Sequence, residues 1–159
     1  MKIRTGFVSN SSSSSFVVEF PFIPTDVQQV RDILFPKYQN VFRSPHTDDS
    51  WDVMKIAETI LGRIETQTPA DQAKVIKEFR AGWSPSMDRL LHCGIPITDH
   101  KYFEQRDEIA DDDSAEFLAT CKGGPLFVFS FSDNDGNYWS ALEHGEVFRN
   151  LNYERISHH

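Results

Sequence analysis

The sequence predicts one α+β domain, in which a small, mostly antiparallel sheet packs against several central helices. Segments at both ends of the chain have the composition of β-strands, and the middle shows helical spacing of apolar residues. After Gly123-Gly124-Pro125 the apolar period changes from that of a helix to that of a strand. A chain of 159 residues with 13% aromatic side chains suits a single domain over residues 1–159.

The N-terminal part predicts two extended segments, residues 2–8 and 16–20, joined by a serine-rich loop over residues 9–15. Apolar side chains dominate residues 16–20, which is typical of a buried strand. We expect this strand to join the strands at the C-terminal end of the chain.

The first predicted helix begins near Thr25, because Thr25 and Gln28 have the spacing of a capping box. Pro36 ends it, since proline cannot continue a helix. A second helix is expected from about Asp48 to Glu65. Its apolar residues fall on one helical face: Val53, Ile56, Ile60 and Ile64.

Two further helices are predicted to open at a Thr or Ser followed by proline, a combination typical of a helix start. One begins at Thr68-Pro69, presents Ile76 and Phe79, and ends at Gly82. The other begins at Ser84-Pro85 and runs to Leu91, and Gly94 follows it.

The charge-rich segment that follows predicts two helices, over residues 98–110 and 113–121. The acidic trio Asp111-Asp112-Asp113 is interpreted as the link between them, which caps the second helix and keeps the link solvated.

The C-terminal region predicts a meander of three strands. Residues 126–131 are apolar on both faces, which predicts a central strand. Residues 133–136 (Asp-Asn-Asp-Gly) have the composition of a hairpin turn rather than of a calcium loop. Residues 137–143 are expected to form the returning strand, and residues 146–151 the third.

Residues 6–17 read GFVSNSSSSSFV, with six serines in the seven positions from Ser9 to Ser15. This segment resembles an N-terminal signature of small uncharacterised proteins of bacteriophages and of some bacteria. The resemblance covers about residues 1–18 and implies an origin. It implies no activity, because proteins with this signature share no assigned chemistry.

The serine run is the first candidate binding site. Successive backbone N–H groups in a loop can bind an anion, and hydroxyl groups add further donors. A recognition tag for another protein, a modification site, a linker and an ordered structural loop are the other interpretations. The candidate residues are Ser9, Asn10, Ser11, Ser12, Ser13, Ser14 and Ser15.

A second candidate site would bind a divalent metal near the C-terminus. Glu143, His144 and Glu146 bracket a predicted turn, and His158 could approach them at the end of the sheet. The spacing of these residues is not diagnostic of a metal site, so a polar turn and a frayed terminus are the competing interpretation.

The net charge of the chain indicates which class of partner it binds. With 24 Asp and Glu against 16 Lys and Arg, the net charge is −8. Nucleic acid is bound through Lys and Arg, so we do not expect direct nucleic-acid binding. We expect a protein partner instead, and one version has the acidic surface cover a basic, nucleic-acid-binding surface of that partner. Homo-oligomerisation stays open.

The motifs that the sequence lacks lead to expectations about its cellular compartment and its catalytic chemistry. No signal-peptide core or transmembrane-length apolar run is present, and neither Cys93 nor Cys121 lies in a CxxC pair. We therefore expect a cytoplasmic protein, in the host cytoplasm if a phage encodes it, with reduced cysteines and no membrane association. No nucleophile motif or fixed cofactor site is found.

The preferred hypothesis is therefore a non-catalytic, phage-type accessory protein that binds a host or phage protein. One alternative is a metal-assisted hydrolase or nucleotide-processing enzyme that uses the C-terminal histidine and glutamate set. The other is a minor structural or assembly component of a phage particle, directed there by the serine signature.

Overall fold

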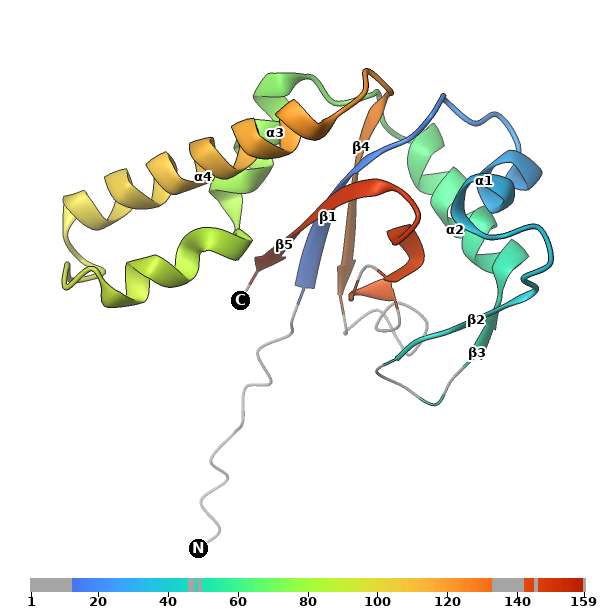
Figure 1. Cartoon of the computed structure of the whole chain (residues 1–159), viewed down its shortest axis with the longest axis horizontal. Coiled ribbons are helices and arrows are strands. Elements are labelled where there is room, and N and C mark those ends of the chain that lie inside the picture. The colour runs from blue at the N-terminus through green and yellow to red at the C-terminus, as the bar shows by residue number, and fades with distance from the viewer. Residues whose placement is uncertain (1–12, 46–47, 49, 133–141, 145, 159) are drawn as a thin grey trace, which may run out of the picture.

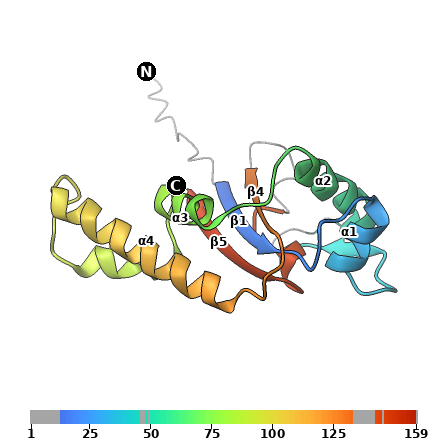
Figure 2. The same cartoon turned by 90° about the horizontal axis from the view of Figure 1, so that it is seen from above.

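The computed structural model describes residues 13–45, 48, 50–132, 142–144 and 146–158. It confirms the α+β class. A small antiparallel sheet lies in the middle, with helices on both of its faces (Figures 1 and 2). Helices α1 and α2 cover one face, and α3 and α4 cover the other.

The described sheet contains strands β1 (Ser13–Glu19), β4 (Leu126–Ser132) and β5 (Asn152–His158) in the order β4-β1-β5. The N-terminal strand therefore joins the C-terminal strands, as predicted, but it lies between them. The prediction that residues 126–131 form the central strand is wrong for the described sheet. Strand β1 is central because Phe16, Val17 and Val18 are fully buried, whereas the residues of β4 alternate between fuller and lesser burial.

The first core lies under helices α1 (Val27–Leu34) and α2 (Val53–Glu65). Phenylalanines from the sheet dominate it, and the helices add one apolar stripe each. Two short strands, β2 (Val41–Arg43) and β3 (Ser50–Asp52), pair with each other beside α2. The predicted apolar face of α2 is confirmed, since Val53, Ile56, Ile60 and Ile64 are all buried.

The second core lies on the opposite face, under α3 (Gln72–Ala81), the 3₁₀ helix η1 (Pro85–His92) and α4 (His100–Thr120). Val17 and Ile156 of the sheet meet Phe79 and Phe117 of the helices there. The side-chain alternation of β1 therefore serves two cores, because successive residues of a strand point to opposite faces.

Several predicted helix starts lie too early. The side chain of Asp26, not that of Thr25, caps α1 by accepting a hydrogen bond from the backbone N–H of Gln29. Residues 50–52 form β3, so α2 begins only after Asp52. Asp71 caps α3, so the Thr68-Pro69 start is wrong, and Val75 rather than Ile76 joins Phe79 in the core. The predicted ends at Pro36 and Gly82 are confirmed.

The largest correction concerns α4. The sequence predicted two helices with Asp111-Asp112-Asp113 as the link between them, but the structure has one continuous helix from His100 to Thr120. Ile109, Ala110 and Phe117 are buried on either side of the trio, so the apolar contacts continue through it. Asp at mid-helix costs only about 0.7 kcal/mol against Ala, and packing overrides that preference.

The C-terminal meander is also corrected. Residues 133–141 lie outside the described residues, so the predicted turn and most of the predicted returning strand do as well. Leu142 and Glu143, at the end of that strand, are not in a strand. The predicted strand over residues 146–151 is instead a 3₁₀ helix, η3 (Glu146–Phe148), followed by a turn, because Val147 and Phe148 are both buried beneath the sheet.

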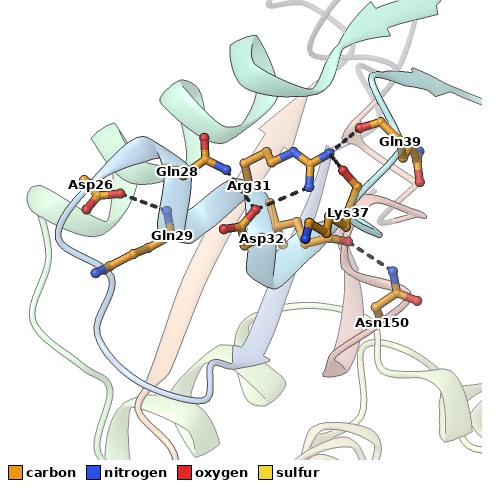
Figure 3. A network of polar contacts seen from close by, with 9 residues as sticks. Asp26, Gln28, Gln29, Arg31, Asp32, Lys37, Gln39 and Asn150 are labelled. Atoms are coloured by element: carbon orange, nitrogen blue, oxygen red, sulfur yellow. Dashed lines mark hydrogen bonds and ion pairs between the residues drawn. The ribbon is translucent and has the colours of Figure 1, made fainter.

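A buried arginine organises the segment between α1 and β2 (Figure 3). Arg31 is 6% exposed. One terminal nitrogen donates to the backbone oxygens of Lys37 and Gln39, at 2.8 and 2.7 Å, and the other lies 3.3 Å from the Asp32 carboxylate. The cation therefore ties the chain after α1 back onto that helix, which gives this residue a structural role.

Within the described residues, no helix is both long enough and apolar enough to cross a membrane. The longest of them, α4, is rich in charged residues.

Candidate functional site

The structure describes only the second part of the serine run, residues 13–15, and these residues belong to the sheet. Residues 9–12 lie outside the described residues, so the binding prediction for Ser9, Asn10, Ser11 and Ser12 stays a prediction. Residues 13–15 were expected in a loop and instead open the central strand β1. The strand continues into the serines because both neighbouring strands pair with them, Ser13 lying opposite Ser132 and His158.

The hydroxyl groups of Ser14 and Ser15 are buried and already bonded. Arg155 donates through Nε to Ser14 Oγ at 3.0 Å. Ser15 Oγ lies 2.9 Å from both Ser130 Oγ and His158 Nε2. These contacts satisfy polar groups that burial would otherwise leave unpaired, so they account for Ser14 and Ser15 as parts of the fold.

The four residues of the predicted metal site fall in different surroundings. His158 lies at the end of β5 against Ser15, Glu143 is buried, and Glu146 begins η3. His144 lies in a turn beside Glu143. Among the residues that the structure describes, no three His, Cys, Asp or Glu side chains gather as they would around a metal ion.

The thiol of Cys121 is poorly suited to nucleophilic chemistry because its pKa is raised. Burial, and then the nearby negative charge of Glu19, raise the pKa of Cys121 to about 11. The thiolate is therefore scarce at neutral pH. Cys93 donates its S–H to the backbone oxygen of Leu90 at 3.0 Å.

Glu19 is the best-coordinated carboxylate of the described chain. It accepts hydrogen bonds from the backbone N–H groups of Lys122 and Gly124, at 2.7 and 2.9 Å, and from Asn152. Burial alone would raise the pKa of Glu19, but these donors outweigh burial and hold the pKa below its ordinary value. Its bonds fasten the loop between α4 and β4, which makes this a structural site.

The acidic residues of helix α4 form a pattern that no contact among the described residues explains. Helix α4 carries seven acidic and two basic residues, and several of the acidic ones follow a spacing of four. Residues four apart lie on the same face of a helix, one turn above the other. Four exposed carboxylates form this set, which we call the α4 carboxylate row: Glu104, Glu108, Asp112 and Glu116.

Among the side chains that the structure describes, only Glu104 of the α4 carboxylate row forms an ion pair. Glu104 meets His100 one turn earlier, at 3.1 Å. Asp111 lies off the row, where hydrogen bonds from Arg80 lower its pKa. Within the described side chains, Glu108, Asp112 and Glu116 form no ion pair and no hydrogen bond.

Two surface hollows lie along α4, on successive turns. The first, of about 350 Å³, lies between α4 and η1 and is lined by Leu90, Gln105, Glu108, Ile109 and Asp112. The second, of about 310 Å³, lies between the C-terminal half of α4 and β5. Asp113, Glu116 and Glu154 are among the residues that line it.

Glu154 in the second hollow has a raised pKa. Burial raises the pKa of Glu154, a hydrogen bond from the Arg155 backbone N–H opposes that rise, and the charges of Asp113 and Glu116 add to it.

Sequence reasoning missed the α4 carboxylate row, although its signal was present. The four-residue spacing from Glu104 to Glu116 is visible in the sequence. The sequence prediction placed a break at Asp111-Asp112-Asp113 and so assigned these residues to two separate helices. Residues on separate helices share no face, and the row was therefore not recognised.

Comparisons of the chain with protein-family models, with curated proteins and with solved structures found no match.

Proposed function

We propose that the protein is a non-catalytic accessory protein that binds a basic surface of another protein through the α4 carboxylate row. The observation that supports the proposal most strongly is the lack of any ion pair for Glu108, Asp112 and Glu116 within the described side chains. A partner that brings Lys or Arg to this face would supply the missing charges.

The energetics of the helix support the same proposal. Like charges four residues apart destabilise a helix by about 0.2–0.5 kcal/mol for each pair. Three such neighbouring pairs follow one another from Glu104 to Glu116. Solubility does not require this arrangement, because charges scattered over the surface would serve as well without the repulsion.

The protein would act in the cytoplasm of a host cell, and its partner would be a host or phage protein. The bacteriophage part rests on the resemblance of residues 6–17 alone. A partner whose basic surface binds nucleic acid is the more specific version, in which the protein covers that surface.

The test is an affinity pull-down from host lysate with the full-length chain, read by mass spectrometry. The row variant is Glu108→Gln with Asp112→Asn. Its matched control, Glu58→Gln with Glu65→Gln, removes two exposed carboxylates from α2 on the other side of the sheet.

We expect the wild type and the α2 control to capture the same partner, and the row variant to lose it. The capture should weaken as salt is raised, because exposed charges are screened over about 10 Å at 0.1 M salt. Capture of no partner at low salt, or equal capture by all three proteins, would contradict the proposal.

A further inference from the structure

The hollow between η1 and α4 combines two kinds of surface. Its floor is apolar, formed by Leu90 and Ile109, which are 2% and 6% exposed. Its wall is acidic, because Glu108 and Asp112 line it from successive turns of α4, about 6 Å apart along the helix axis. Gln105 adds a neutral polar group.

These two surfaces together restrict what can fill the groove. A purely apolar side chain would suit the floor but would take water from two carboxylates without replacing it. A small cation would suit the wall and leave the floor uncovered. A long side chain with an apolar stem and a cationic head suits both, because the stem covers apolar surface while the head reaches the charges.

Arginine fits the wall better than lysine does. Its planar guanidinium presents five N–H donors and can bond two carboxylates at once, whereas the lysine ammonium acts as a compact point charge that holds its water more strongly. Arginine is also enriched among the residues that contribute most to protein interfaces.

The apolar floor of the groove suits a side chain of a protein better than a free inorganic cation. The hairpin formed by η1 and α4 exposes three large apolar side chains: Leu91 (66%), Ile97 (65%) and Phe103 (51%). This hairpin extends away from the sheet, with the start of α4 at its far end (Figures 1 and 2).

We infer that the groove between η1 and α4 is a socket for an arginine side chain of the partner. The stem would lie over Leu90 and Ile109, and the guanidinium would bond Glu108 and Asp112. As a mode of partner binding this inference rests on the proposed function, but the socket itself can be tested without the partner.

The probe is Nα-acetyl-L-arginine amide, titrated into the ¹⁵N-labelled full-length protein and followed by NMR. Nα-acetyl-L-citrulline amide is the matched control, because citrulline keeps the length and shape of arginine without its charge. Nα-acetyl-L-lysine amide tests the preference for the guanidinium group.

We expect saturable shifts at the amides of Leu90, Glu108, Ile109 and Asp112 with the arginine probe. We expect weaker shifts with lysine and none with citrulline. The double variant E108Q and D112N should abolish the response, and E58Q with E65Q should keep it. Far-UV circular dichroism of both variants checks that the fold is intact.

Two results would overturn the socket. Shifts spread evenly over the acidic surface would show non-specific attraction, and equal shifts with citrulline would show that charge plays no part. If the pull-down retains its partner after E108Q and D112N, the socket is not the means of binding although the protein does bind. If the arginine probe binds the groove and no partner is captured, the socket holds and the proposed function fails.

Discussion

At the scale of single residues, two buried charged groups, Arg31 and Glu19, hold segments of the chain together. Arg31 fastens the segment after α1 to two backbone oxygens, and Glu19 fastens the loop after α4 to two backbone N–H groups. In both cases one ionised side chain satisfies backbone groups that lie outside regular structure, where an unpaired buried group would cost about 1–3 kcal/mol.

Glu19 makes the stability of the protein depend on pH. Because its pKa is lowered in the folded state, the carboxylate stabilises the fold above its ordinary pKa of 4.5, and this contribution is lost as the pH falls through the lower folded value. We expect Glu19→Gln to reduce the free energy of unfolding by about 1–3 kcal/mol at pH 7.

The same substitution should cost less at pH 3, which lies below the ordinary pKa of 4.5, because the stability that the lowered pKa of Glu19 provides declines below that pH. Urea unfolding of the wild type and of Glu19→Gln at the two pH values measures the difference. The exposed control Glu65→Gln should change little at either pH. A cost for Glu19→Gln that does not depend on pH would contradict the role assigned to this carboxylate.

At the scale of elements, a side chain forms hydrogen bonds with backbone groups of strand β4. The amide group of Gln67, just after α2, accepts from the backbone N–H of Val128 at 3.1 Å and donates to its backbone oxygen at 3.0 Å. The Gln67 side chain thus takes the place of a neighbouring strand at this point and protects two backbone groups.

We expect Gln67→Ala to speed amide hydrogen exchange at Val128 by about fivefold, which corresponds to the loss of a hydrogen bond worth roughly 1 kcal/mol. Amides at the β1 pairing, such as that of Val17, should exchange as in the wild type. The control Gln72→Ala removes an exposed amide from α3. Unchanged exchange at Val128 would show that the side-chain contact does not protect the strand.

In helix α4, the binding role that we propose and the stability of the fold make opposite predictions for the same substitutions. If the α4 carboxylate row serves a partner, removing charge from it should stabilise the isolated protein. We expect E108Q with D112N to raise the free energy of unfolding by roughly 0.6–1.5 kcal/mol at low salt, since all three repulsive pairs are relieved. The gain should shrink as salt screens the charges.

Thermal and urea unfolding at low and high salt measure this effect, with E58Q and E65Q as the control of equal charge change. A loss of stability in the row variant would mean that these carboxylates support the fold. The argument for a partner would then lose its energetic basis.

At the scale of the whole molecule, sequence patterns predicted the class and much of the arrangement. The apolar run from Phe16 to Phe20 and the phenylalanines of residues 126–131 marked two strands, and the stripe of α2 marked its buried face. These predictions succeeded because burial on a defined face leaves a periodic signal in the sequence.

The failures have physical causes. Strand order depends on pairing between distant segments, which periodicity does not encode, so β4 was placed in the centre. Serine has no strong strand preference, and Ser13–Ser15 became strand only because β4 and β5 pair with them. The α4 carboxylate row was lost when local helix preference at Asp111-Asp112-Asp113 was weighed without the packing of Ile109 and Phe117.

The start of β1 determines where the signature can be cut without damage to the fold. Removal of residues 1–12 leaves β1 whole, so we expect the melting temperature to change by less than about 4 °C. Removal of residues 1–15 also deletes Ser14 and Ser15 with their bonds to Arg155, Ser130 and His158, and should lower it by roughly 8 °C or more.

Scanning calorimetry of the two truncated proteins and the full-length chain makes the comparison. Equal melting temperatures for the two truncations would contradict the structural role of Ser13–Ser15. The shorter deletion is also the appropriate variant for asking whether residues 1–12 recognise a partner, because it keeps all of the described strand β1.

The central claim is that the α4 carboxylate row binds a basic surface of another protein, and a quantitative pull-down tests it most directly. The full-length chain, E108Q with D112N, and E58Q with E65Q are compared in host lysate at low and high salt. The account predicts one partner with a basic surface, captured by the wild type and by the α2 control, lost from the row variant and released by salt. Equal capture by all three proteins, or no capture by any of them at low salt, would contradict it.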